Sequence, residues 1–167
     1  MAETIGGTRG SAQVVVKGYN PAFVVEKKVN GSDFYPGLVC TGFGETDPDV
    51  DLCSTGEPPL GIVIEHFRND GLAGTVRDTP DIDAVYTDNA LVRVAVCGSG
   101  MACLCFAKQT TTAIIYPGSK MFVGSTAAGY LDVAATTDTF TSFISYVGTS
   151  LDYDAGGVLA KVITVVI

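Results

Sequence analysis

The chain has 167 residues, of which 47% are hydrophobic and only 17% are charged, and its formal net charge is −8. This length allows one well-buried core, or two small cores packed against each other. The charged fraction is below the roughly 25% usual for a globular domain, so we expect part of the apolar surface to contact another protein. Nucleic acid is an unfavourable partner, because phosphate repels the acidic chain and the densest basic cluster is only Lys27-Lys28.

Membrane insertion is not indicated either. No stretch approaches the ~20 consecutive apolar residues that span a bilayer, and the first residues, "MAETIGGTRGSAQ", lack the apolar segment of a secretory signal. We therefore expect a soluble intracellular product with no membrane partner.

Residues 1–13 are small and mostly polar, with little to bury, and so predict an extended N-terminal arm. Residues 14–167 are expected to form a single domain with two pseudo-repeated halves. Helical periodicity is nearly absent from them, whereas glycine, proline, valine, threonine and isoleucine are frequent. This composition is typical of short strands joined by tight turns, and it predicts an all-β fold.

The first predicted strands cover residues 12–17 and 22–29. Asn30-Gly31 then predicts a hairpin that returns the chain through residues 32–35, because both residues tolerate positive φ. The tetrapeptide "YPGL" at 35–38 predicts a type II turn, in which proline presets φ at the first central position and glycine supplies the positive φ at the second.

Residues 42–59, rich in acidic residues and proline, are interpreted as an excursion over the surface. Asp47, Asp49 and Asp51 alternate there and could bind calcium. The stretch lacks the glycine and distal glutamate of an EF-hand loop at their required places, which favours solvated carboxylates.

Residues 60–67 predict a strand that is buried on both faces, since the run "LGIVI" is continuously apolar. After a polar connection, residues 84–98 predict two strands around Thr87-Asp88-Asn89, and "MACLCF" at 101–106 predicts another.

A second "YPG" corner stands at Tyr116-Pro117-Gly118. Strands are expected at residues 120–123, 130–134, 140–151 and 158–167, with a "DYDAGG" turn before the last. The second half therefore repeats the order of the first half: a corner, a strand, a polar stretch, an apolar-glycine step and a valine-rich strand. This weak internal repeat predicts that the two corners turn equivalent strands in two related halves.

Candidate catalytic groups are few. His66 is the single histidine, and no Gly-x-Ser-x-Gly elbow accompanies it, which favours a structural or surface role. The glycine-rich segments 97–102 and 123–129 lack the lysine and following helix of a phosphate loop and are interpreted as turns. Paired carboxylates could imitate a glycosidase site but stand in turn-like contexts; they are Asp81 with Asp83 and Asp152 with Asp154. We expect no catalytic, cofactor or metal site.

Five cysteines occur without the CxxC spacing of a zinc site: Cys40, Cys53, Cys97, Cys103 and Cys105. The favoured interpretation is buried, reduced thiols that fill space in the core. A disulfide between Cys40 and Cys53 in oxidising surroundings is the alternative.

The second half resembles the head decoration, or capsid-cementing, proteins of tailed viruses. The resemblance is carried by "LVRVAVCGSG", "AIIYPGSKMFVGSTAAGYLDV" and "ISYVGTSLDYDAGGVLAKVITVVI", with "YPGLV" and "PLGIVIEH" fitting the same pattern in the first half. It covers about residues 23–167. The matching positions are Val92, Val94, Val96, Gly98, Pro117, Gly118, Val147, Gly148, Leu151, Gly156 and Gly157. The acidic stretch 42–59 and the five cysteines depart from the pattern.

The resemblance implies a small β-barrel or β-tulip domain, a homotrimer that binds the outside of an icosahedral shell and ties major capsid subunits together. The expected location is the outer surface of the virion capsid, after synthesis in the host cytoplasm. The expected capsid contacts lie in the N-terminal arm, at Thr4, Ile5, Gly6, Gly7, Thr8 and Arg9.

Two other classes stay open. One is another viral structural subunit, such as a shell, tube or spike protein. The other is a β-barrel module for a small ligand or glycan, using Tyr130, Tyr146 and Tyr153. The favoured interpretation instead places those tyrosines in the core or at a subunit interface.

Overall fold

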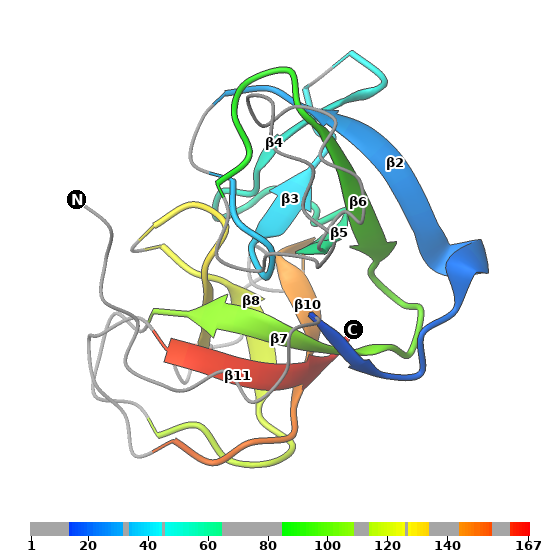
Figure 1. The fold of residues 1–167 in the computed structure, drawn as a ribbon. Coiled ribbons are helices and arrows are strands. Elements are labelled where there is room, and N and C mark those ends of the chain that lie inside the picture. The colour runs from blue at the N-terminus through cyan, green and yellow to red at the C-terminus, as the bar shows by residue number, and fades with distance from the viewer. Residues whose placement is uncertain are drawn as a thin grey trace.

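The computed structural model describes residues 14–31, 34–44, 46–64, 85–108, 114–125, 127–133, 144–154 and 161–167. The fold is all-β, as the sequence predicts, and it contains two small closed barrels of five strands each (Figure 1). The first barrel, in blue to green at the top of Figure 1, is followed in sequence and in space by the second.

The first barrel closes in the order β2-β4-β3-β5-β6. β2 and β4 are parallel, and the other neighbours are antiparallel. A short 3-10 turn, η1 (Pro21–Phe23), precedes β2 and is capped by the Asn20 side chain, which accepts a hydrogen bond from the Ala22 N–H. The strand bounds are β2 (Val24–Val29), β3 (Val39–Thr41), β4 (Asp49–Leu52), β5 (Gly61–Ile64) and β6 (Leu91–Val96).

The second barrel closes in the order β7-β9-β8-β10-β11, and here β7 and β9 form the parallel pair. β1 (Val15–Lys17) adds to it by pairing with β7. The strand bounds are β7 (Ala102–Ala107), β8 (Lys120–Val123), β9 (Leu131–Val133), β10 (Tyr146–Ser150) and β11 (Lys161–Val166).

The two barrels repeat one topology with the same strand register. β2 corresponds to β7, β3 to β8, β4 to β9, β5 to β10 and β6 to β11, and residues 34–52 correspond one for one to residues 115–133. In the first barrel Val39 pairs with Ile62, and in the second barrel the equivalent residue, Lys120, pairs with Thr149. Ile62 in turn pairs with Ala95, as Thr149 pairs with Val166.

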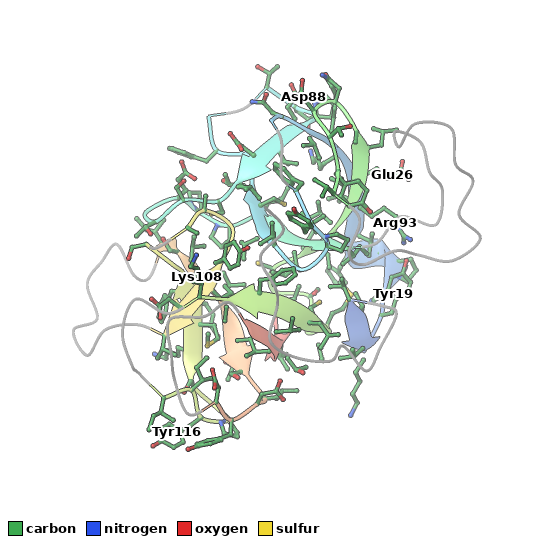
Figure 2. All side chains as sticks on the ribbon, turned by 60° about the vertical axis from the view of Figure 1, so that its left-hand side comes forward. Tyr19, Glu26, Asp88, Arg93, Lys108 and Tyr116 are labelled. Atoms are coloured by element: carbon green, nitrogen blue, oxygen red, sulfur yellow. The ribbon has the colours of Figure 1, made fainter. Side chains whose placement is uncertain are left out.

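Both "YPG" corners adopt the predicted turn. The Leu38 N–H donates to the Tyr35 carbonyl at 3.2 Å with Gly37 at φ 99°, and the Ser119 N–H donates to the Tyr116 carbonyl at 2.9 Å with Gly118 at φ 92°. Their surroundings differ: residues 36–38 are buried, whereas residues 116–118 are exposed. Tyr116 lies at the opposite end of the molecule from Asp88 (Figure 2).

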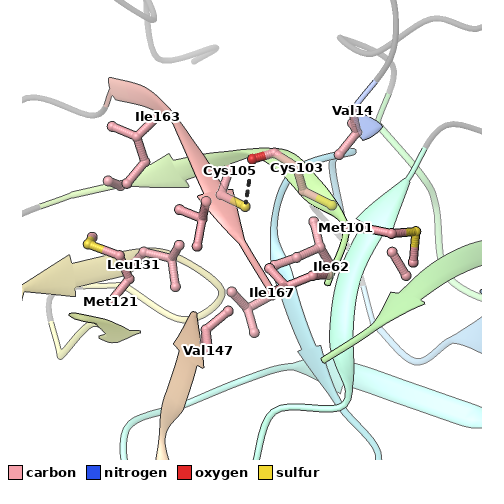
Figure 3. Close-up of a cluster of buried hydrophobic side chains, with 14 of the residues drawn as sticks. Val14, Ile62, Met101, Cys103, Cys105, Met121, Leu131, Val147, Ile163 and Ile167 are labelled. Carbon is pink, nitrogen blue, oxygen red and sulfur yellow. Dashed lines mark hydrogen bonds between the residues drawn. The ribbon is translucent and has the colours of Figure 1, made fainter. Parts of the chain in front are cut away.

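The core has two parts. One fills the first barrel alone and includes Phe34, Val63 and Val94. The other fills the second barrel and extends into the junction between the barrels, since it includes Ile62 and Ile64 from the outer side of β5 together with Met121 and Leu131. Figure 3 shows this cluster, in which Ile62 lies near Met101 and Met121 lies near Leu131. β5 therefore serves both cores, and all four of its residues are buried. This confirms for Gly61–Ile64 the prediction of a strand buried on both faces.

The predicted hairpin at Asn30-Gly31 is wrong. β2 does not pair with the segment that follows it; its neighbours are β4 and β6. The Asn30 N–H donates to the Val50 carbonyl at 2.8 Å, which holds the end of β2 in the parallel pair. The turn chemistry was identified, since Gly31 has φ 104°, but the barrel selects a different partner.

The interpretation of residues 42–59 as a surface excursion is also wrong in part. They contain β4, in which Val50 is fully buried, and the strand closes the first barrel.

The two strands predicted in residues 84–98 are not both present among the described residues. Only β6 forms as a strand there, and Tyr86 makes an isolated bridge to Phe34.

Gly61 and Gly148 hold equivalent positions where strands approach too closely for a side chain. A Cβ on Gly61 would lie 2.1 Å from the Ala95 carbonyl oxygen, and one on Gly148 would lie 2.2 Å from that of Val166. Contacts with backbone atoms cannot be relieved by a rotamer change.

Gly61→Ala and Gly148→Ala are therefore expected to destabilise the fold by about 1–3 kcal/mol each, the cost of overpacking a close-packed site. Urea unfolding followed by circular dichroism measures the change. Gly42→Ala is the matched control, because a Cβ there meets no heavy atom within 4 Å and Gly42 does not have positive φ. Equal midpoints for all three variants would contradict the assigned strand contact.

Candidate functional site

The predicted capsid-contact residues of the arm, Thr4 to Arg9, lie outside the described residues. The structure describes the residues that directly follow the predicted arm. Val14 is fully buried, its carbonyl accepts a hydrogen bond from the Leu104 N–H at 2.8 Å, and Val15 pairs with Cys103. β1 thus attaches the preceding residues to β7 of the second barrel.

The candidate catalytic groups are not brought together among the described residues. His66, Asp81 and Asp83 lie outside them. Asp152 acts in a turn: its Oδ2 accepts from the Thr164 N–H at 2.6 Å, and its N–H donates to the Ser150 hydroxyl at 3.1 Å. Asp154 forms a backbone bridge with Ile115. These roles are those of turn-stabilising aspartates.

The acidic stretch uses its described carboxylates within the chain. Asp47 pairs with Lys27, and Asp49 lies 3.5 Å from the Lys28 ammonium. Asp51 and Glu57 accept hydrogen bonds from the backbone N–H groups of Leu52 and Ser54. Within the described part of the chain, no group of three or more His, Cys, Asp or Glu side chains is arranged to hold a metal ion.

All five cysteines are free thiols in the structure, and all but Cys97 are buried. Cys40 lies in the core of the first barrel, whereas Cys53 lies in the core shared with the second. Burial raises the pKa of the Cys53 and Cys97 thiols from 9.0 to about 12. It raises the pKa of Cys40 and Cys105 as well, with neighbouring thiols adding to the effect. The thiols are therefore protonated and weakly nucleophilic near neutral pH.

The glycine-rich segments form turns. Gly98 and Gly100 have φ of 86° and 76° in the tight connection between β6 and β7. In the connection between β8 and β9, Gly129 is buried between the barrels: its N–H donates to the Cys53 carbonyl at 2.8 Å, and its carbonyl accepts from the Val39 N–H at 2.8 Å. These backbone groups hold the two barrels together.

Exposed apolar side chains gather on the outer side of β10 and beside the second corner. We call this group the second-corner face. The Tyr116 and Tyr153 rings lie 5.7 Å apart, and both side chains are more than half exposed. The face consists of Ile114, Tyr116, Tyr146, Leu151 and Tyr153.

The three tyrosines named from the sequence thus differ in environment. Tyr130 is half-buried, with its ring 5.9 Å from that of Phe106. Tyr146 and Tyr153 are exposed on the second-corner face. A smaller exposed group lies at the start of β2, where the Arg93 guanidinium bonds the Tyr19 hydroxyl and Phe23 is exposed (Figure 2).

Sequence reasoning missed Ile114 and the contrast between the two corners. A signal was present: Leu38-Val39 after the first corner is replaced by Ser119-Lys120 after the second. Because apolar residues are expected at buried positions and polar residues at exposed ones, this substitution in a repeated motif indicates that only the first corner is packed.

No protein-family model matches the chain, and no curated protein matches it with significance. Among the described residues, no helical segment has the length and apolar character to cross a bilayer.

Thiol-specific reagents are expected to modify the native protein slowly and to modify all five cysteines rapidly in denaturant, because the folded thiols are buried and protonated. Stability should be fully retained below pH 9 and fall as the pH rises toward 12. In that window the unfolded chain's thiols ionise while the folded thiols keep their protons.

Native and denatured reaction time courses at one pH, together with urea midpoints across the window, measure both effects. A Cys97→Ser variant, which removes the one partly exposed thiol, should abolish most of the native reaction. Rapid native modification that persists in this variant would contradict the assigned burial.

Proposed function

We propose that the chain is a structural virion protein that binds the outside of an icosahedral capsid and stabilises contacts between major capsid subunits. The proposal rests on the sequence resemblance to head decoration proteins and on one structural observation. The predicted arm, residues 1–13, directly precedes Val14 and β1, where Val14 and Val15 are buried and β1 pairs with β7 of the second barrel. The barrel then acts as a rigid body that an extended segment can attach to a surface.

Extended arms bind by main-chain hydrogen bonds, as in strand addition, and residues 1–13 have the small polar composition that such segments use. A cement that binds the assembled shell and not loose subunits stabilises the shell by mass action. Many copies at symmetry-related places make modest individual contacts collectively strong. The expected partners are the major capsid protein and other copies of this chain in a homotrimer.

A glycan-binding module is the second candidate, supported by the exposed Tyr116–Tyr153 ring pair. Aromatic faces of this kind stack on apolar surfaces. Co-sedimentation with protein shells distinguishes the two functions, because a glycan-binding module is not expected to bind the shells and sediment with them.

Deleting residues 1–11 is expected to reduce the occupancy of this protein on capsids by about tenfold or more, since the arm supplies the main contacts. The deletion spares Val14 and Val15, so the fold should persist. Co-sedimentation with empty heads, assembled from the major capsid protein encoded closest to this chain's gene, measures the occupancy.

A second variant, with residues 1–11 replaced by a glycine-serine segment of equal length, separates the arm's sequence from its length. Both variants should keep the unfolding midpoint of the full chain. Full occupancy of the deleted variant would reject the role of the arm, and failure of the full chain to sediment with the heads would reject capsid binding altogether.

A further inference from the structure

Asn30-Gly31 is the turn motif whose predicted hairpin does not form, and the fold instead places a carboxylate against it. The Gly31 N–H donates to Asp88 Oδ1 at 2.9 Å, although 57 residues separate the two in the sequence. Asn30, Gly31 and Asp88 are all exposed. The motif is therefore in contact with solvent and with a distant acidic group at the same time.

Hydrogen bonds on both sides hold this carboxylate in place. The Asn89 N–H donates to the Val29 carbonyl at 2.9 Å, and the Val29 N–H donates to the Ala90 carbonyl at 2.9 Å. The Asn89 side chain also donates to the second carboxylate oxygen, Asp88 Oδ2, at 2.7 Å. The other oxygen, Oδ1, is thereby directed at the Gly31 nitrogen, so the fold itself sets this contact.

An asparagine that precedes a glycine can react with the next peptide nitrogen. In this chain the Gly31 nitrogen would attack Asn30 Cγ, so that a new N–C bond closes a succinimide ring. The Cγ–Nδ2 bond then breaks and releases ammonia, which carries away the proton that the Gly31 nitrogen has lost. Water opens the ring and leaves aspartate or isoaspartate at position 30. The reaction consumes water alone, and its demanding step is the removal of the proton from the Gly31 nitrogen.

We propose that Asn30-Gly31 is a site of self-modification, at which Asp88 is the general base for the deamidation of Asn30. A general base must lie within about 2.6–3.2 Å of the atom whose proton it takes, and Asp88 Oδ1 meets this requirement. Asp88 takes the proton from the Gly31 nitrogen and returns it to the departing amide group. Glycine leaves the approach open, because the one heavy atom near a Cβ at position 31 would be Asp51 Oδ1, at 4.0 Å.

The other asparagines in the described part of the chain lack this arrangement. Asn20 precedes Pro21, whose nitrogen has no proton to lose. Asn89 precedes Ala90, which is buried and whose N–H donates to a backbone carbonyl. A carbonyl oxygen is a far weaker base than a carboxylate. The structure therefore assigns the reaction to Asn30.

The modification changes the point at which the first barrel closes. The Asn30 N–H donates to the Val50 carbonyl at 2.8 Å and so extends the parallel pair of β2 and β4. A new carboxylate at position 30 would stand close to Asp51 and Asp88, and like charges repel. Isoaspartate also lengthens the main chain at this point. We therefore expect the modified chain to have a less stable first barrel, whether or not it binds capsids or glycans.

Incubation of the purified full chain, followed by mass spectrometry of tryptic peptides, measures the reaction. Trypsin cleaves after Lys28 and Arg68, and residues 29–68 contain one asparagine and no glutamine. The replacement of NH2 by OH in this peptide therefore reports Asn30 alone. A sample digested without incubation measures the background.

Asp88→Asn is the decisive variant, because it keeps an oxygen that accepts from the Gly31 N–H and removes the basic charge. It should slow the loss of Asn30 by about tenfold or more, since a positioned general base contributes at least this much. Asn89→Gly permits the same positive φ and releases Asp88 Oδ2, so it should slow the reaction by a smaller factor. Asp47→Asn is the matched control: it removes a nearby charge that pairs with Lys27, and it should leave the rate unchanged.

Urea midpoints establish that each variant is folded. A wild-type chain that keeps Asn30 intact through prolonged incubation overturns the proposal, as does an equal rate in Asp88→Asn. A faster rate in Asp88→Asn also overturns it, because the contact would then protect Asn30. Asn30→Asp, which carries the charge of one product, should lower the urea midpoint, and an unchanged midpoint would contradict the expected loosening of the first barrel.

Discussion

The structure depends on one repeated backbone constraint, the close approach of a glycine to the strand beside it. In each barrel the fourth strand in chain order, β5 or β10, comes so near its neighbour that a Cβ would lie about 2 Å from a carbonyl oxygen, at Gly61 and at Gly148. Because side-chain direction alternates along a strand, this approach fixes which residues face the interior. Val63 and Ser150, two residues further on, are both buried inside their barrels.

The two barrels share a backbone but differ in their surfaces, and that difference determines what each can bind. Several equivalent interior positions are apolar in both, as at Cys40 and Met121 or at Val50 and Leu131. Equivalent outer positions diverge, as at Val39 and Lys120. The first set is required by packing in a closed barrel. The second set is free to change, so it differs according to whether the chain itself covers that position.

Local features of this fold were predictable from the sequence, whereas strand partners were not. Both "YPG" turns follow from proline and glycine chemistry, and the run at Gly61–Ile64 indicates burial on both faces. The hairpin at Asn30-Gly31 failed because a parallel partner, β4, competes for the same strand end. The sequence did not predict β4, because Asp49 and Asp51 flank the buried Val50 and give this strand an acidic composition. Predicting that the second corner is exposed requires a comparison of Leu38 with the equivalent Ser119, and composition alone does not provide that comparison.

Closed barrels make exposed apolar residues effective in binding. A side chain held by a closed barrel loses little backbone freedom when a partner covers it, so most of the gain from burying an exposed residue such as Tyr116 or Leu151 would be retained as affinity. The junction within the chain fixes the relative orientation of the two barrels through the Gly37 and Gly129 hydrogen bonds. Rigid spacing of two faces raises the effective concentration for a second contact once the first has formed. Under the proposed function, a rigid tandem of barrels would suit a protein that binds in many copies, because the copies add their modest individual contacts together.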